Sequence, residues 1–368
     1  SAFDVVMEVD TSGFQLPTGK AGQEGKFVET LAGEAQSGCA DWVPLLEERD
    51  RDKPFFVWLA ALDPHRDYRE NIVETPHGPQ DVQVAPYHLA DEATKGDYAL
   101  YYDEIHRLDR YVGKVLETLE DQGVAENTLV LFISDNGRPF PRDKTTLYDS
   151  GIKTPWILRW PDHVSAGGRC GKLVSVLDIA PTFLACAGIP IPDAFRGIDF
   201  RPLLSDPDTA IRDFVFAEKN WHDYEDHVRM VRSERFKLLH NGYPDLPQTP
   251  SADSARSPTF QVLLAKRNSE ELTMAQKSCF SAPRAALELY DVDADPHELT
   301  NLVEEADVAA VKKELILAMD GWAKETGDYV PLQRTADEFD RVTGTPTPAR
   351  VRPRHTKEKM VADGLVAP

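Results

Sequence analysis

The sequence is short of cysteine, of cationic side chains and of long apolar runs, and each shortage excludes a class of protein. Its four cysteines have no regular spacing, so they predict neither a disulfide framework nor a zinc site, and they do not fix the redox compartment. Its 41 lysines and arginines face 62 aspartates and glutamates, and the net charge of −21 argues against nucleic acid as a partner. No apolar run approaches the roughly 20 residues of a membrane-spanning helix, so we expect no membrane partner.

The composition and the order of patterns suit a large α/β protein. Of the 368 residues, 41% are hydrophobic, which is sufficient for one large domain or for two of ordinary size. Residues 94–122 carry apolar side chains at helical spacing, and they separate two apolar runs, 55–62 and 129–133, that indicate buried strands. A strand, a helix and a strand in this order form a crossover, which predicts that the two strands are parallel and paired or near neighbours.

The pattern changes near residue 205, where short strands separated by turns replace the crossover. Before this point, strands are predicted at 155–160 and 173–177. After it, they are predicted at 214–217, 228–232, 236–240 and 287–292. Residues 306–324 indicate an amphipathic helix, and residues 242–286 show little periodicity, which suggests a long insertion. The predicted domains are an α/β part, a smaller subdomain with an antiparallel sheet, and a tail, at 1–205, 206–335 and 336–368.

Two strand ends carry the residues with chemical potential. Asp135 and Asn136 follow one apolar run directly, and oxygen pairs of this kind suit a hard cation such as Ca²⁺ or Mg²⁺. A run of cations comes next and would form a cradle for an oxyanion: Arg138, Arg142, Lys144, Lys153 and Arg159. The other interpretation is a simple turn, because Asn-Gly is a strong turn dipeptide.

The second strand end contains Asp63, Pro64, His65 and Arg66, which follow the apolar run 55–62. If both strands belong to one parallel sheet, both polar clusters fall at the same edge, where ligands bind in open α/β sheets. The alternative for His65 is a capped strand end that hydrogen-bonds to a neighbour, and the alternative for a cation such as Lys144 is a surface lysine.

Together these stretches resemble the sulfatase family of the alkaline phosphatase superfamily, in the branch of heparan N-sulfatase-like (N-sulfoglucosamine sulfohydrolase-like) enzymes. The resemblance is carried by four stretches, which read PFFVWLAALDPHRDY, TLVLFISDNGRPFPRDKTTLYDSGIKT, SPTFQVLL and LELYDVDADPHELTNL. It implies an alkaline phosphatase-like α/β sandwich with a mostly parallel central sheet flanked by helices. A smaller C-terminal α+β subdomain with an antiparallel sheet would follow.

The resemblance also implies roles for individual residues. Asp135 and Asn136 would be Ca²⁺ ligands, with Mg²⁺ or Mn²⁺ as alternatives; Lys144 would contact the sulfate, and His65 would lie near the leaving group. A histidine suits that place because its pKa lies near neutrality. The residues expected to bind substrate are Arg66, Arg142, His222 and His227. The two histidines belong to KNWHDYEDHVR, which could equally be a polar hairpin turn.

One family feature is not among the 368 residues. Sulfatases carry a Cys or Ser in a C/S-x-P-x-R motif that becomes the formylglycine nucleophile, and no cysteine here has proline and arginine at those positions. We therefore expect the chain to correspond to the C-terminal two-thirds of a sulfatase, with formylglycine on an N-terminal segment that acts as its partner. The other expected partners are a sulfated sugar of glycosaminoglycan type and a second copy in a homodimer. A periplasmic, extracellular or lysosome-like compartment would be typical of the family.

Two other functions remain open from the sequence. One is a metal-dependent phosphatase or phosphonate hydrolase of the same superfamily, which a panel of substrates would distinguish. The other is a non-catalytic relative that binds anionic sugars or serves as a scaffold. A fold without its first strands would expose an apolar sheet edge, which disfavours a free-standing fragment and favours a partner segment.

Overall fold

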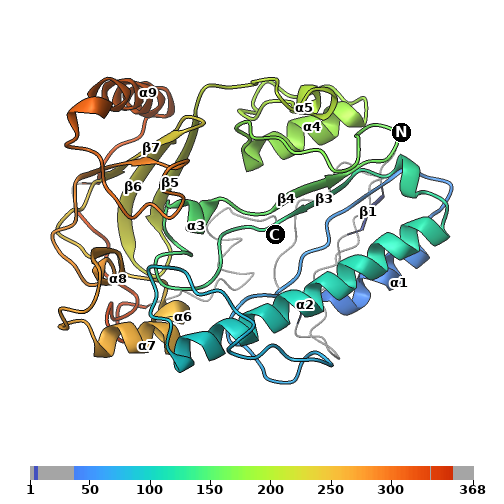
Figure 1. The fold of residues 1–368 in the computed structure, drawn as a ribbon. Coiled ribbons are helices and arrows are strands. Elements are labelled where there is room, and N and C mark those ends of the chain that lie inside the picture. The colour runs from blue at the N-terminus through green and yellow to red at the C-terminus, as the bar shows by residue number, and fades with distance from the viewer. Residues whose placement is uncertain (1–3, 7–36, 332, 351–368) are drawn as a thin grey trace, which may run out of the picture. The chain divides into compact units, whose positions relative to one another are not determined.

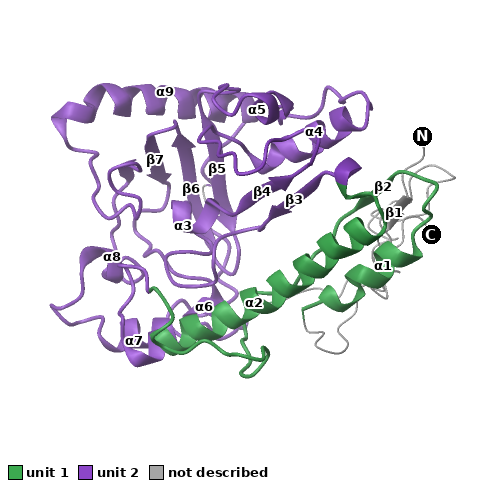
Figure 2. Ribbon diagram, turned by 45° about the vertical axis from the view of Figure 1, so that its right-hand side comes forward, with its two compact units in different colours: residues 1–83, 95–125, 350–368 green, residues 84–94, 126–349 purple. Residues whose placement is uncertain are grey.

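The structure is a computed structural model, and it describes residues 4–6, 37–331 and 333–350. The chain divides into two compact units, which Figure 2 colours separately. Unit 1 comprises residues 1–83, 95–125 and 350–368, and unit 2 comprises residues 84–94 and 126–349. The domain boundary predicted at residue 205 lies inside unit 2 and stays a prediction. The last part of the predicted tail, 351–368, lies outside the described residues.

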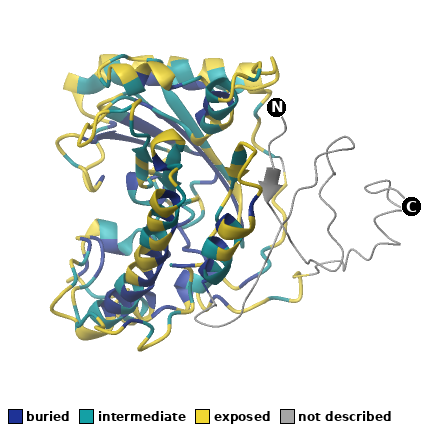
Figure 3. Cartoon of the chain, turned by 90° about the vertical axis from the view of Figure 1, so that its right-hand side faces the viewer, coloured by how far each residue is buried: buried dark blue, intermediate teal, exposed yellow. Residues whose placement is uncertain are grey.

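Unit 2 is built on a four-stranded antiparallel sheet, as predicted for this part of the chain. Its strands lie side by side in chain order (Figure 1): β5 (Val215–Trp221), β6 (Glu225–Arg232), β7 (Phe236–Asn241) and β8 (Leu287–Asp291). Short hairpins at 222–224 and 233–235 join the first three strands, and such short connections permit only antiparallel pairing. Strand β6 lies inside the sheet, between β5 and β7, and all of its residues except the last are buried. Figure 3 colours the chain by burial.

Helix α9 (Ala309–Thr326) covers one face of this sheet, and a 3₁₀ turn at Ala306–Val308 precedes it. Side chains of a strand alternate between the two faces of a sheet, so every second residue of each strand can reach the helix. The buried cluster between sheet and helix consists of Val231, Leu238, Leu289, Val303, Leu315 and Met319. The predicted amphipathic helix is therefore confirmed, with its apolar side against the sheet.

The opposite face of the sheet carries a segment that comes from far upstream in the chain. Leu147 and Tyr148 pack there against Met230, Leu239 and Tyr290, which alternate with the residues that face α9. Helix α3 (Asp149–Ile152) continues this segment directly. The sheet is thus a platform that fixes the position of the residues immediately after Lys144.

Strands β3 (Val130–Ile133) and β4 (Trp156–Arg159) form a separate antiparallel pair in unit 2. The sequence predicted a buried strand at β3, but all four of its residues are only half-buried, because it pairs as part of a two-stranded ribbon. Ile157 on β4 is 62% exposed. Both strands are therefore where the pattern predicted them, but the burial predicted for β3 is wrong.

The strand predicted at 173–177 is also wrong. A 3₁₀ turn occupies Val176–Asp178, because the hydroxyl of Ser175 accepts from the Leu177 N–H and the Asp178 carboxylate accepts from the Ser175 N–H. This capping box caps the 3₁₀ turn, which runs directly into helix α4 (Ile179–Cys186). A further short helix, α5 (Arg201–Ser205), follows.

The segment expected to be an insertion, 242–286, contains three short helices: α6 (Ala252–Ala255), α7 (Pro258–Ala265) and α8 (Met274–Lys277). Their apolar periodicity is invisible in the sequence because two of them span only one turn. The start of α7 does carry a signal, since Ser257 caps it through the Phe260 N–H and proline occupies the first helical position.

Unit 1 contains the long helix α2 (Glu92–Asp121), whose first residues belong to unit 2, and the short helix α1 (Trp42–Glu48) after a 3₁₀ turn at Cys39–Asp41. Another 3₁₀ turn, Ala125–Asn127, follows α2. Strands β1 (Asp4–Val6) and β2 (Phe55–Val57) pair in parallel. Within the described part of the chain, no helix is both long enough and apolar enough to span a bilayer.

The predicted strand 55–62 is thus much shorter than the apolar run that suggested it. Beyond Val57 the ladder with β1 ends, and Trp58 and Leu62 are 68% and 51% exposed. The long helix is confirmed with an earlier start, where the Asp91 side chain accepts from the Thr94 N–H. Because β2 and β3 belong to different units, their parallel relationship stays a prediction.

Candidate active site

Residues 137–151 form a closed loop that follows β3 and ends within α3. The N–H of Gly137 donates to the carbonyl of Gly151 at 2.8 Å, so the two ends of the loop meet. Neither glycine has room for a side chain: a Cβ at Gly137 would lie 1.9 Å from the carbonyl oxygen of Ser150, and one at Gly151 would lie 2.4 Å from that of Asp143. The loop therefore closes by a backbone approach that only glycine permits.

Lys144 lies in this loop between two residues with left-handed backbone. Arg142 and Thr145 have φ angles of 66° and 67°, a region that residues other than glycine adopt uncommonly. The Lys144 N–H donates to the carbonyl of Arg138 at 3.1 Å, which folds the loop back toward β3. Its Nζ lies 3.0 Å from the carboxylate of Asp253, and the two side chains are only 8% and 14% exposed.

Asp253 is an ionised partner for this lysine. Its burial raises the pKa, but Lys144 and a hydrogen bond from Ser251 outweigh that effect and hold the pKa at about 2. A carboxylate that stays charged fixes the ammonium in one place, because two opposite charges with little water between them attract strongly. Lys144 is therefore not the surface lysine of the alternative interpretation.

The hairpin between β5 and β6 reaches the same short helix that carries Asp253. The Asp223 carboxylate accepts from the Ala252 N–H at 2.6 Å and lies 2.9 Å from Nδ1 of His222. His222 is exposed at the tip of this hairpin. His222 and Lys144 are thus both linked to helix α6 in unit 2. Asp223 connects His222 to the Ala252 N–H, and Lys144 pairs with the adjacent residue, Asp253.

Asp135 and Asn136 leave β3 as predicted, the first exposed and the second half-buried. Oδ1 of Asp135 accepts from the Asn136 N–H at 2.8 Å, and Nδ2 of Asn136 donates to the Gly137 carbonyl at 2.6 Å. Oxygen donors of these two kinds fit Ca²⁺, but that ion takes about six to eight oxygens. In the described ranges no group of three or more His, Cys, Asp or Glu side chains is arranged around a metal position. The pair fits part of a Ca²⁺ site.

The other cations of the loop do not form the open cradle that the sequence suggested. Arg142 is 4% exposed; it donates to the carbonyl of Glu298 at 2.6 Å and lies over the Tyr148 ring at 3.9 Å. Arg138 donates to the carboxylate of Asp143 at 2.6 Å. The burial of Arg142 and its carbonyl partners give it a structural position and argue against the predicted substrate contact.

His227 also differs from its prediction as a substrate-binding residue. It lies within β6, is 2% exposed, and its Nε2 is 3.1 Å from the carbonyl oxygen of Tyr329. Burial lowers the pKa of this histidine. A ring enclosed between the sheet and a carbonyl cannot touch a sugar, so His227 is a core residue.

In unit 1, His65 is exposed between two anchors on helix α2. Arg66 donates to both carboxylate oxygens of Asp97 at 2.6 and 2.8 Å, and Arg107 donates to both oxygens of Asp63 at 2.7 Å. Nδ1 of His65 hydrogen-bonds to the carbonyl of Arg66. The Arg66 side chain is 4% exposed, so its charge serves this anchor, which argues against the predicted contact with substrate.

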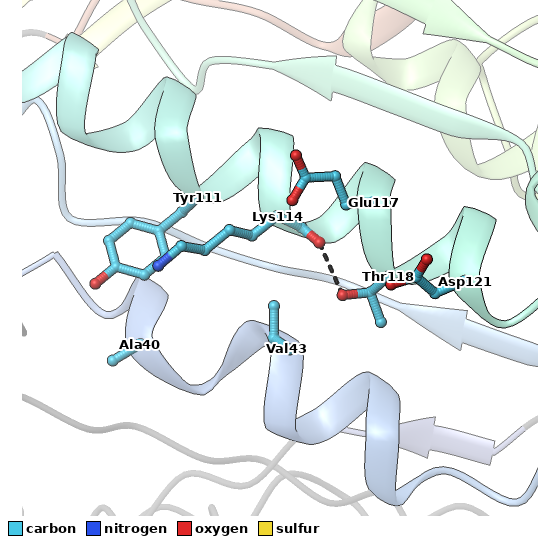
Figure 4. A pocket seen from close by; sticks show the side chains of 7 residues that line it. All are labelled: Ala40, Val43, Tyr111, Lys114, Glu117, Thr118 and Asp121. Atoms are coloured by element: carbon cyan, nitrogen blue, oxygen red, sulfur yellow. Dashed lines mark hydrogen bonds between the residues drawn. The ribbon is translucent and has the colours of Figure 1, made fainter.

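The two clusters predicted to meet at one sheet edge lie in different units, so their meeting stays a prediction. Unit 1 also has a hollow of about 300 Å³, in which side chains of α2 face α1 (Figure 4). Its lining consists of Ala40, Val43, Tyr111, Lys114, Glu117, Thr118 and Asp121. None of the predicted site residues lines this hollow.

Sequence reasoning missed two residues on which the site depends. Asp253, the partner of Lys144, lies in the stretch expected to be an insertion, and no spacing pattern pointed to it. Glu298 was not singled out from the sequence, yet its carbonyl accepts from Arg142 and its carboxylate accepts from the Asp149 N–H. A search for buried partners of the cations in the loop would have found both, and only the structure makes that search possible.

Comparison with known proteins gives these residues a context. The family model described as Sulfatase matches residues 36–189, and the model described as N-sulphoglucosamine sulphohydrolase, C-terminal, matches residues 140–278. An ulvan-active sulfatase of Formosa agariphila is 34% identical over 282 residues, which cover 75% of this chain and 47% of that protein. N-sulphoglucosamine sulphohydrolase of Homo sapiens is 33% identical over 314 residues, which cover 75% of this chain and 62% of that protein. The chain thus spans about half to three-fifths of the length of these relatives.

Solved structures share the fold at lower identity. A protein in complex with its substrate D-glucosamine-2-N,6-O-disulfate superposes with a TM-score of 0.54 at 20% identity, covering 80% of this chain and 70% of that chain. A 2-O GAG sulfatase superposes with a TM-score of 0.58 at 18% identity, covering 84% of this chain and 68% of that chain. The predicted alkaline phosphatase-like α/β fold is therefore confirmed, and by both family models and these relatives the chain belongs to the sulfatase family.

Proposed function

We propose that this chain supplies the metal-binding and sulfate-binding part of an enzyme that hydrolyses a sulfuric ester or sulfamate on a sulfated carbohydrate. The observation that carries the proposal is Lys144, a lysine fixed by the Asp253 carboxylate in a loop that starts directly after Asp135 and Asn136. A fixed ammonium and a pair of hard oxygen ligands are groups that suit the binding of a sulfate.

Lys144 would contact the sulfate oxygens. Negative charge on those oxygens shifts as the bond from sulfur to the leaving atom breaks, and a cation that is already in place stabilises that change without having to reorganise. Asp253 supports this role because it fixes the ammonium before the substrate arrives. His222 would contact the sugar from the hairpin tip, since Asp223 orients it through Nδ1.

Asp135 and Asn136 would hold Ca²⁺, with Mg²⁺ or Mn²⁺ as alternatives, together with ligands from elsewhere in the working enzyme. When bound, such an ion neutralises charge on the sulfate. The donation from Nδ2 of Asn136 to the Gly137 carbonyl leaves Oδ1 as the amide atom for the cation.

His65 would protonate the leaving oxygen or nitrogen. Its Nδ1 faces a carbonyl, which places the ring proton there and makes Nε2 the atom that exchanges a proton with substrate. The anchors at Asp63 and Arg66 hold the backbone on both sides of the ring. The nucleophile, a formylglycine, would come from residues outside these 368, and a homodimer stays a prediction.

The relatives favour a sugar sulfate as the substrate class, because one is named for activity on ulvan and another as an N-sulphoglucosamine sulphohydrolase. The experiment is a substrate panel for the enzyme that contains this chain together with its nucleophile. We expect release of sulfate from glucosamine N-sulfate or from an O-sulfated sugar, and loss of release after treatment with EDTA. Turnover of phosphate or phosphonate esters in preference to both sulfated sugars would contradict the proposal.

A further inference from the structure

We propose that Glu298 is a positioning residue for Lys144, acting through the residues on both sides of it; this inference rests on the proposed function. Glu298 lies in the turn after β8, far from the loop in sequence. Its carbonyl accepts from Nη2 of Arg142 at 2.6 Å, and its Oε2 accepts from the N–H of Asp149 at 2.6 Å. One residue therefore holds the chain two residues before Lys144 and five residues after it.

The contacts of Glu298 are shielded from water. Its side chain is 1% exposed, and its Oε1 lies 2.8 Å from Nζ of Lys237, which is fully buried. Lys237 also pairs with the Asp149 carboxylate and donates to the carbonyl of Leu147 at 3.2 Å. Arg232 completes the set as a second partner of Asp149. The carboxylates of Asp149 and Glu298 thus pair with Lys237 and Arg232, and the exposed Lys153 is a further partner of Asp149 at 3.7 Å.

The two cations, Arg232 and Lys237, come from one face of the sheet. Arg232 on β6 and Lys237 on β7 point to the side that carries Leu147 and Tyr148, opposite α9. Strand pairing fixes their backbones, so the position of Asp149 is set by the sheet and not by the loop itself. The ion pairs therefore transfer the rigidity of the sheet to the segment that ends the loop.

The loop requires such external support because its own backbone is strained. Arg142 and Thr145 flank Lys144 with left-handed φ angles, and Glu298 itself has a φ of 54°. Conformations of this kind persist when the surrounding contacts over-determine them. If the contacts of Glu298 were lost, the residues around Lys144 would relax, and the ammonium would leave the position that Asp253 and the sulfate require.

A purely stabilising role for Glu298 makes a different prediction. A buried ion pair that only holds the fold together would change the unfolding transition, but it would leave the opening of the loop and the rate constant of the folded enzyme unaltered. The test therefore compares the local opening of the loop and the kinetic constants kcat and KM in variants that remain folded.

The experiment uses two double variants that lose the same two charges. In Lys237→Met/Glu298→Gln an amide oxygen remains for the Asp149 N–H, whereas in Lys237→Met/Glu298→Leu no acceptor remains. The control is Asp178→Asn/Arg212→Met, which also removes both charges of a buried pair away from the loop. Asp178 is a fully buried carboxylate that accepts backbone N–H groups and pairs with Arg212. Removal of both charges together avoids an unpaired buried ion, which protects the fold.

Hydrogen exchange of residues 138–151 in the chain is the first readout, and it does not depend on activity. We expect the leucine variant to exchange at least about tenfold faster there than the glutamine variant, with β6 and β7 unchanged. In the working enzyme, kcat of the leucine variant should fall about 10- to 100-fold below that of the glutamine variant, since a displacement of about 1 Å costs as much. Asp178→Asn/Arg212→Met should leave both readouts near their wild-type values.

Equal exchange and equal kcat in the two double variants would overturn the positioning role of Glu298. Faster exchange with unchanged kcat would also overturn it, because the loop would then open without consequence for Lys144. The proposed function fails separately: a wild-type enzyme without desulfation, whose leucine variant still opens the loop, would remove the sulfatase assignment and leave the anchoring by Glu298 intact.

Discussion

The ammonium of Lys144 lies 3.0 Å from the carboxylate of Asp253, and both side chains are largely buried. The pair joins a loop in the middle of the chain to a four-residue helix about a hundred residues later. Because neither partner is well solvated, the attraction between the two charges offsets the free-energy cost of burying them. The pair links the stability of unit 2 to the group proposed to bind sulfate.

A double-mutant cycle on this pair should reveal a strong coupling. We expect Lys144→Ala and Asp253→Ala each to reduce the free energy of unfolding by about 1–3 kcal/mol, since each leaves a charge without its partner. The double variant should be less destabilised than the sum of the two, with a coupling of about 1–3 kcal/mol in urea unfolding. A coupling near zero would mean that the two charges are solvated separately.

Closure of the loop should depend on the two glycines at its ends. Gly137→Ala would place a methyl group 1.9 Å from the Ser150 carbonyl oxygen, so the two ends of the loop would have to separate. We expect a loss of about 2–4 kcal/mol in unfolding free energy, as for other overpacked sites. Gly167→Ala is the matched control, since a Cβ there meets nothing within 4 Å, although its φ of 76° adds a smaller strain. Equal destabilisation by both substitutions would contradict the close approach.

Stability should fall as the pH drops below about 6.5 because of His88. Burial lowers the pKa of His88, whose Nε2 donates to the Pro141 carbonyl at 2.7 Å. The folded state thus binds its proton at lower pH than the unfolded state, so this contribution to stability is present above pH 6.5 and is lost as the pH falls through the folded-state pKa.

His88→Gln keeps a donor for Pro141 and removes the titration. We expect the pH dependence of the unfolding free energy to flatten by up to about 1.4 kcal/mol per pH unit within that window. His227 and His240, whose pKa values burial also lowers, will maintain part of the slope. An unchanged slope in His88→Gln would show that His88 does not contribute.

The anchor of His65 should be sensitive to charge removal at Asp97. Asp97→Ala leaves the Arg66 guanidinium buried without its bidentate partner, and we expect a loss of about 3–5 kcal/mol in unfolding free energy. Faster hydrogen exchange at 63–68 would accompany it. Asp50→Ala is the control, because the Asp50–Lys53 pair is exposed and such pairs contribute little. Similar unfolding curves for the two variants would rule out a structural anchor at Arg66.

Calcium binding by the chain itself should be weak. Asp135 and Asn136 supply two oxygens to an ion that takes about six to eight, so we expect a dissociation constant above about 0.1 mM by calorimetry. Asp135→Ala should abolish the residual heat of binding. Tight binding that survives Asp135→Ala would locate the metal elsewhere in the chain.

Much of the fold could be predicted because its periodic elements are long. The spacing in 94–122 and 306–324 indicated helices that the structure contains, and the short strands after residue 205 form the predicted antiparallel sheet. The failures have physical reasons. Residues 173–177 have the apolar pattern of a strand, but Ser175 and Asp178 cap a 3₁₀ turn there. The apolar run 55–62 extends beyond its three-residue partner strand.

The candidate site was predictable in part for a similar reason. Residues at the ends of strands are visible in sequence, and Asp135, Asn136, Lys144 and His65 came from such ends. Partners that arrive from elsewhere in the chain leave no local pattern, so Asp253 and Glu298 were missed. Burial is equally invisible in a motif, which is why Arg142, Arg66 and His227 were predicted to bind substrate although all three are enclosed.

Sulfate release by the working enzyme that contains this chain, with and without Lys144→Ala, tests the central claim most directly. Glucosamine N-sulfate and an O-sulfated sugar are tested as substrates in parallel assays. Circular dichroism verifies that the variant is folded. We expect the wild type to release sulfate and Lys144→Ala to be slower by at least about 100-fold, because a fixed cation at the developing charge is lost. Wild-type turnover in folded Lys144→Ala would remove Lys144 from the site and contradict the account.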